Sequence, residues 1–135
     1  MSKVYKFIHL SAYLTIVHGF IYGLYKYAFQ LETEYGVRPH PQQEFWQASH
    51  IILSPIFIFG LGLLWKDHII KMFKHSAAKR KSGIGLSIFA LVMCISGYLV
   101  QTIYQYKSEL GLIHSVLAGT FTILYLIHHL LTRKA

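Results

Sequence analysis

Four long apolar stretches, separated by shorter polar segments, dominate the pattern along the chain. They cover about residues 4–29, 45–66, 83–104 and 110–131. Each comes close to the ~20 predominantly apolar residues that a helix needs to cross a bilayer. We therefore expect an all-α membrane protein in which residues 1–135 form a single domain, a bundle of four transmembrane helices.

The polar segment between the first two stretches is not expected to be helical. Residues 30–44 contain Gly36, Pro39 and Pro41. Proline disfavours helix at its own position and at the position before it. Extended or turned backbone is predicted there, with His40 as a solvated loop residue.

The basic residues are distributed unevenly between the polar segments. Segment 66–82 holds six of the thirteen, against a single acidic residue, Asp67, and four more lie near the two ends of the chain. Basic residues gather on the cytoplasmic side of membrane proteins. Both termini and the middle loop are therefore expected to be cytoplasmic, and the net charge of +8 is explained by membrane topology and contact with lipid instead of nucleic acid.

Composition agrees with a membrane protein and limits the covalent chemistry. Hydrophobic residues make up 54% of the chain, and the mean hydropathy is +0.43. The single cysteine, Cys94, excludes a disulfide framework. No Cys-x-x-Cys-His motif occurs, so covalent attachment of a c-type haem is excluded as well.

Histidines inside the apolar stretches are the candidate functional residues, because ionisable side chains within a membrane are costly and usually serve a function. His114 and His128 are fourteen residues apart in one stretch. That spacing is about four helical turns, so both lie on one face, ~21 Å apart along the axis. Such a helix would form half of a two-level cofactor site.

The other stretches supply histidines at matching depths. Measured from the expected helix ends, His50 and His114 are each roughly 6–8 Å below the outer surface, and His9 and His128 roughly 5–8 Å above the inner one. Neutral imidazole is the usual axial ligand of haem iron. Two pairs follow, His50 with His114 and His9 with His128, with His18 as the rival of His9 for the inner site.

Local motifs accompany these histidines. They are Lys6-Phe-Ile-His9, Gln47-Ala-Ser-His50 with a glycine-rich run after it, Ser96-Gly97-Tyr98, and the His114/His128 pair followed by His129. These motifs resemble those of the bacterial four-helix dihaem cytochromes b, the group that includes the cytochrome b subunits of hydrogenases and formate dehydrogenases. The resemblance covers nearly the whole chain. It implies two non-covalently held b-type haems, with iron ligands at His9, His50, His114 and His128.

A protein of this kind would carry electrons across the bacterial inner membrane, between a quinone pool and a redox partner protein. It would act as an electron-transfer protein or as a subunit of a membrane oxidoreductase, with quinone as a second candidate ligand and a homodimer as a compatible assembly. Two other interpretations stay open. One is a transporter or sensor whose histidines bind a metal ion or relay protons, and the other is a structural anchor for a redox partner.

Overall fold

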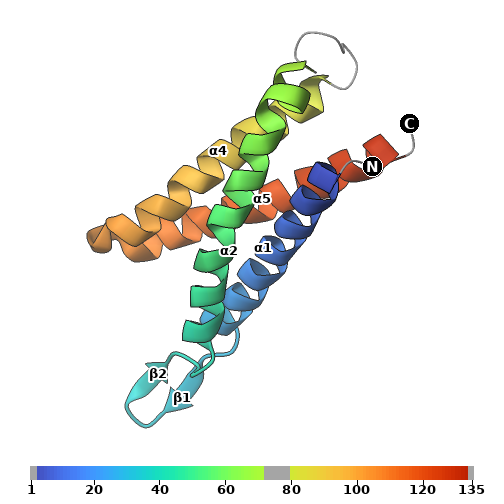
Figure 1. Ribbon diagram of the computed structural model, residues 1–135. Coiled ribbons are helices and arrows are strands. Elements are labelled where there is room, and N and C mark those ends of the chain that lie inside the picture. The colour runs from blue at the N-terminus through green and yellow to red at the C-terminus, as the bar shows by residue number, and fades with distance from the viewer. Residues whose placement is uncertain (1–2, 72–79, 134–135) are drawn as a thin grey trace. The chain divides into compact units, whose positions relative to one another are not determined.

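The computed structural model describes residues 3–71 and 80–133, and the chain divides into two compact units, residues 1–64 and 65–135. We call these the N-terminal and C-terminal units. The first holds α1 (Lys3–Tyr27), β1 (Leu31–Thr33), β2 (Gly36–Arg38) and α2 (Gln43–Leu64) (Figure 1). The second holds the π-helical turn η1 (Trp65–Ile70), α4 (Arg80–Thr102), the 3₁₀ turn η2 (Tyr104–Tyr106) and α5 (Lys107–Arg133).

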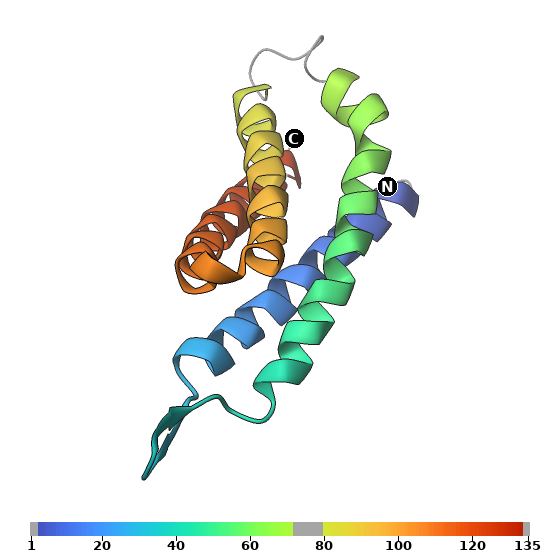
Figure 2. The same ribbon diagram turned by 90° about the vertical axis from the view of Figure 1, so that its left-hand side faces the viewer.

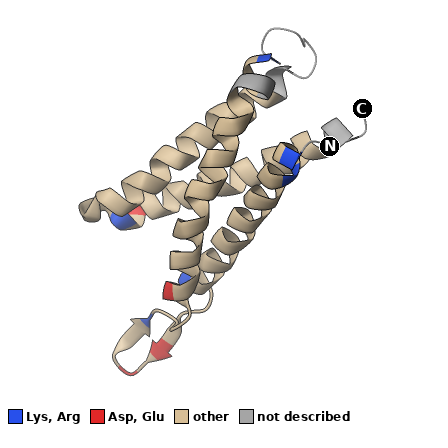
Figure 3. Ribbon diagram, in the orientation of Figure 1, with Lys and Arg blue, Asp and Glu red and all other residues tan. Residues whose placement is uncertain are grey.

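All four expected helices are present, and each is long and apolar enough to cross a membrane. Large apolar side chains point outward from them, as at Phe20, Ile52 and Ile95, which are 67%, 67% and 59% exposed. In Figure 3 the coloured acidic and basic residues lie toward the helix ends and in the connecting segments. Exposed apolar helices of this kind are typical of a multi-pass membrane protein, because lipid is a good solvent for them and water is not.

The N-terminal unit is a pair of antiparallel helices that pack along their small residues. Ile8, Ser11, Ala12 and Thr15 of α1 are buried at helical spacing. A Cβ built on Gly60 of α2 would lie 3.3 Å from Ile8 Cγ1 and 3.4 Å from Ser11 Oγ. The missing side chain at this glycine therefore lets the two helices approach closely.

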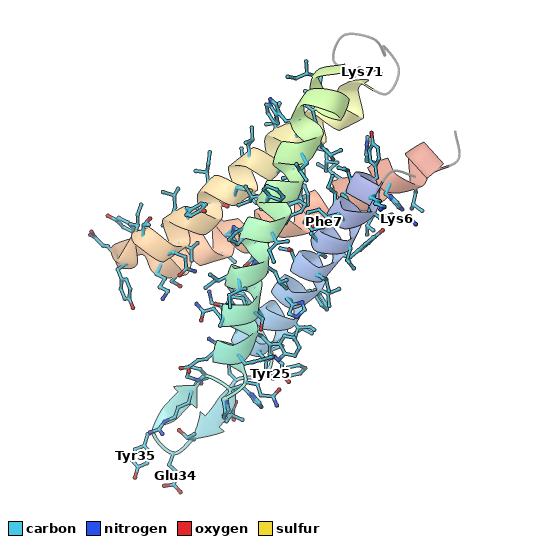
Figure 4. The ribbon with its side chains drawn as sticks, in the orientation of Figure 1. Lys6, Phe7, Tyr25, Glu34, Tyr35 and Lys71 are labelled. Carbon is cyan, nitrogen blue, oxygen red and sulfur yellow. The ribbon has the colours of Figure 1, made fainter. Side chains whose placement is uncertain are left out.

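A short β-hairpin connects α1 to α2, where the sequence predicted only extended or turned backbone. Leu31 pairs with Arg38, and Thr33 pairs with Gly36. Gly36 has φ +104°, in the left-handed region that only glycine adopts readily, and the Thr33 hydroxyl donates to its carbonyl at 2.6 Å. Figure 4 labels Glu34 and Tyr35 at the tip of this turn.

The C-terminal unit is a second antiparallel helix pair, in which α4 and α5 lie side by side (Figure 2). Its buried residues in the described part of the chain are Ala90 and Ser96 of α4 and Gly111, Phe121 and Tyr125 of α5. The helix ends differ from expectation by two or three residues, since α4 begins at Arg80 and α5 extends from Lys107 to Arg133. The π-helical form of η1 and the turn η2 were not predicted.

Candidate cofactor site

His50 of α2 is held by two features of α1. A Cβ on Gly19 would lie only 2.8 Å from His50 Cε1, so the imidazole ring occupies the space that a side chain at position 19 would need. The Nδ1 atom lies 3.1 Å from the carbonyl oxygen of Thr15. A carbonyl can only accept a hydrogen bond, so Nδ1 carries the proton and Nε2 carries the lone pair.

His114 of α5 is held by α4 in a similar way. Its ring lies against Gly97, where an added Cβ would be 3.2 Å from His114 Cε1. Its Nδ1 atom is 2.8 Å from the hydroxyl oxygen of Ser96. That hydroxyl is itself 2.8 Å from the carbonyl of Met93 and donates its only proton there. The Ser96 oxygen must then accept from His114 Nδ1–H, which again leaves the lone pair on Nε2.

The two histidines share a tautomer, and each lies at the same distance from the start of its own helix. His50 lies seven residues after Gln43, the first residue of α2, and His114 lies seven residues after Lys107, the first residue of α5. At ~1.5 Å per residue, each imidazole is about 10 Å inside its helix. A neutral imidazole with Nδ1–H anchored to the protein and its lone pair on Nε2 is the form in which histidine binds a metal.

His9 and His128 lie near the opposite ends of their helices. His9 comes six residues after Lys3, the first residue of α1, and His128 comes five residues before Arg133, the last residue of α5. A Cβ on Gly83 of α4 would lie 3.9 Å from His128 Cε1, an ordinary contact distance. Both imidazoles are half-buried.

His18, the rival for the inner site, lies at the level of His50 within the N-terminal unit. It directly precedes Gly19, the residue against which the His50 ring packs. Its Nδ1 donates to the carbonyl of Leu14 in its own helix at 2.8 Å, and its ring lies 5.4 Å from that of Trp46. Its position is therefore about nine residues, or ~13 Å, from the level of His9.

The remaining histidines whose side chains are described sit among aromatic residues. His129 stacks on Tyr125 one turn earlier in α5, at 6.3 Å between centroids. His40 lies 4.8 Å from the ring of Tyr25, and its Nδ1 accepts a hydrogen bond from the backbone of Gln42. The loop assignment of His40 thus agrees with the structure.

The predicted ligands are divided between the two units. His9 and His50 belong to the N-terminal unit, and His114 and His128 belong to the C-terminal unit. Each predicted pair takes one member from each unit. Within the described residues, no three histidine, cysteine, aspartate or glutamate side chains are grouped so that they could hold a metal ion. Haem iron needs only two protein ligands, since two axial imidazoles complete its coordination.

The sequence did not indicate the hydrogen-bonding roles of two supporting residues, although Ser96 belongs to the Ser96-Gly97-Tyr98 motif. The Thr15 carbonyl belongs to the backbone, so no residue type could have indicated it. Ser96 could have been found, because a serine-glycine step within an apolar helix places a hydroxyl beside a gap.

Comparison of the chain with protein-family models, with curated proteins and with solved structures found no match. The functional assignment therefore depends on the residues and the geometry of the chain itself.

Proposed function

We propose that the protein is a dihaem b-type membrane cytochrome that carries electrons across the bacterial inner membrane. In this proposal the four helices form one bundle with both termini in the cytoplasm. His50 and His114 are the axial ligands of the outer haem, and His9 and His128 are those of the inner haem.

The observation that carries the proposal is the matched pair of anchored imidazoles. His50 and His114 come from different units, yet each is seven residues inside its helix, and each donates Nδ1–H to an oxygen of the neighbouring helix. Each ring also rests on a glycine. Hydrogen bonding on Nδ1 is the usual second-shell support of metal-ligating histidine, since it fixes the ring and raises the basicity of Nε2.

The chemistry of the residues fits b-type haem. A bound haem supplies the one-electron redox chemistry, and the protein supplies position, axial ligands and dielectric. Neutral imidazoles avoid the cost of placing a charge in the hydrocarbon. His114 and His128 face one side of α5, ~21 Å apart along its axis, which would place one ligand near each membrane surface.

Electron transfer across a membrane requires an electron donor and an electron acceptor. Electrons entering at one level must leave at the other, so we propose exchange with the quinone pool at one side and with a redox protein at the other. The exposed apolar surfaces of the helices would lie in the lipid phase, where quinones dissolve. The protein would then be an electron-transfer protein or a subunit of a membrane oxidoreductase.

A reduced-minus-oxidised spectrum of the purified protein in detergent tests the proposal. We expect a low-spin b-type spectrum, and His114→Ala should remove about half of it. His129→Ala is a matched control, because it removes a histidine adjacent to His128 and should leave the spectrum intact.

The same preparation separates the alternatives. A colourless protein with bound zinc or copper would overturn the cytochrome proposal in favour of a metal transporter or sensor. A colourless protein free of metal would favour a structural anchor.

A further inference from the structure

The two histidines of α5 face two glycines of α4 in one continuous register. Gly97 lies against His114, and Gly83 lies against His128. The glycines are fourteen residues apart, and so are the histidines. Fourteen residues make about four helical turns, so in an antiparallel pair the two glycine–histidine contacts have the same spacing along both helices.

The repeat in α4 includes a second residue. Ser96-Gly97 and Ser82-Gly83 are the only two serine-glycine steps in the sequence, and they are fourteen residues apart. Both belong to α4. The serine-glycine step that lies beside His114 therefore recurs in the sequence at Gly83.

The hydrogen bonds of Ser96 show how a serine-glycine step can support a histidine. A chain of hydrogen bonds runs from His114 Nδ1–H to the Ser96 hydroxyl and from there to the Met93 carbonyl. Donation to Met93 polarises the hydroxyl, which makes its oxygen a better acceptor for the imidazole proton. Ser96 is 7% exposed, so water does not replace it readily.

We infer that the Ser96-Gly97 step of α4 is the support that tunes His114 as a haem ligand. Ser96 is a positioning residue that selects the Nε2 lone-pair tautomer and sets the strength of that nitrogen as a ligand. Gly97 gives the ring its space. The inference rests on the proposed haem function.

Packing alone makes a different prediction. Small residues also let membrane helices approach closely, and in that case loss of the Ser96 hydroxyl would change stability without changing the imidazole of His114. The two accounts are separated by measurements on the histidine nitrogens and on the redox potentials.

The test uses Ser96→Ala in the full chain, with Ser87→Ala as the matched control. Ser87 lies on the same helix but donates to the carbonyl of Gly83 in that helix. In a redox titration, Ser96→Ala should raise the midpoint potential of one haem, because a weaker ligand stabilises ferric iron less. The midpoint potential of the other haem should stay unchanged in Ser96→Ala, and Ser87→Ala should change neither.

The Ser96→Ala variant should also bind that haem about tenfold more weakly, and Ser96→Thr should restore both properties because it keeps the hydroxyl. His114→Ala identifies which haem is affected. Unchanged potentials in Ser96→Ala, or a change of the other haem, would overturn the inference.

A measurement without haem keeps this inference separate from the proposed function. In the ¹⁵N spectrum of histidine-labelled protein, His114 should show a protonated Nδ1 and an unprotonated Nε2, and Ser96→Ala should produce a mixture of tautomers. A single unchanged tautomer in Ser96→Ala would refute the role of Ser96, whatever the cofactor. Failure of the wild-type protein to bind haem would refute the proposed function while leaving this result standing.

Discussion

Replacing Gly19 by alanine would put a methyl group into the space that the His50 ring occupies. The new Cβ would lie 2.8 Å from Cε1 and 3.0 Å from Nδ1, whereas ordinary contact begins at 3.4 Å. The ring would have to move by 3.4 − 2.8 = 0.6 Å or more. Such a shift would strain or break its 3.1 Å hydrogen bond to the Thr15 carbonyl.

Overpacking of this kind costs about 1–3 kcal/mol of stability. Loss of an anchored hydrogen bond in the interior costs about 1 kcal/mol more. We therefore expect Gly19→Ala to lower the free energy of unfolding by about 2–4 kcal/mol. If His50 binds haem, the variant should also lose most of the haem that depends on it.

Three other glycines provide a graded series for the same assay, thermal unfolding in detergent followed by circular dichroism together with the haem spectrum. An added Cβ at Gly97 would lie 3.2 Å from the His114 ring, and at Gly83 it would lie 3.9 Å from that of His128. At Gly23, one turn beyond Gly19, it would meet nothing within 4 Å. The expected order of damage is Gly19, then Gly97, with Gly83 and Gly23 near neutral or stabilising, because alanine is the better helix former. Equal stability of Gly19→Ala and Gly23→Ala would refute the reasoning.

Two further predictions concern residues outside the proposed ligand set. His18→Leu should leave both haem signals intact, since His18 lies at the level of His50 and is bonded to its own helix; loss of the inner haem in this variant would instead assign that site to His18. Gly36→Ala should destabilise the β1–β2 turn by about 1 kcal/mol, because alanine is strained at φ +104°. Faster hydrogen exchange at Thr33 and Arg38, with an unchanged haem spectrum, would be the measured result, and unchanged exchange would contradict it.

The helices could be predicted from sequence because length and apolarity alone specify a membrane-spanning segment. Their ends could not be placed as well: residues 80–82 read as part of a basic loop, yet α4 already begins at Arg80. The β1–β2 hairpin was missed because each strand is only three residues long, too short to show alternation. The turn η1 lacks any proline or glycine that would have marked a change of helix type.

Part of the candidate site could be predicted from the sequence, and part could not. The four histidines were found from their depth and spacing, which a linear pattern contains. The hydrogen-bond acceptor for His50 was not predicted. Every residue has a backbone carbonyl, and only the packing of α1 against α2 brings that of Thr15 to the imidazole. The pairing of ligands between the N-terminal and C-terminal units stays a prediction.

The acceptors of His50 and His114 differ in how they are encoded. The oxygen that supports His50 belongs to the backbone, so it persists through almost any substitution at position 15 that keeps α1 helical. The oxygen that supports His114 depends on one side chain, and a single nucleotide change could remove or replace it. Under the proposed function, inherited variation at position 96 could therefore adjust the electron affinity of the outer haem through His114, while the bond from His50 stays constant. A lineage could in this way match different redox partners without changing the helices.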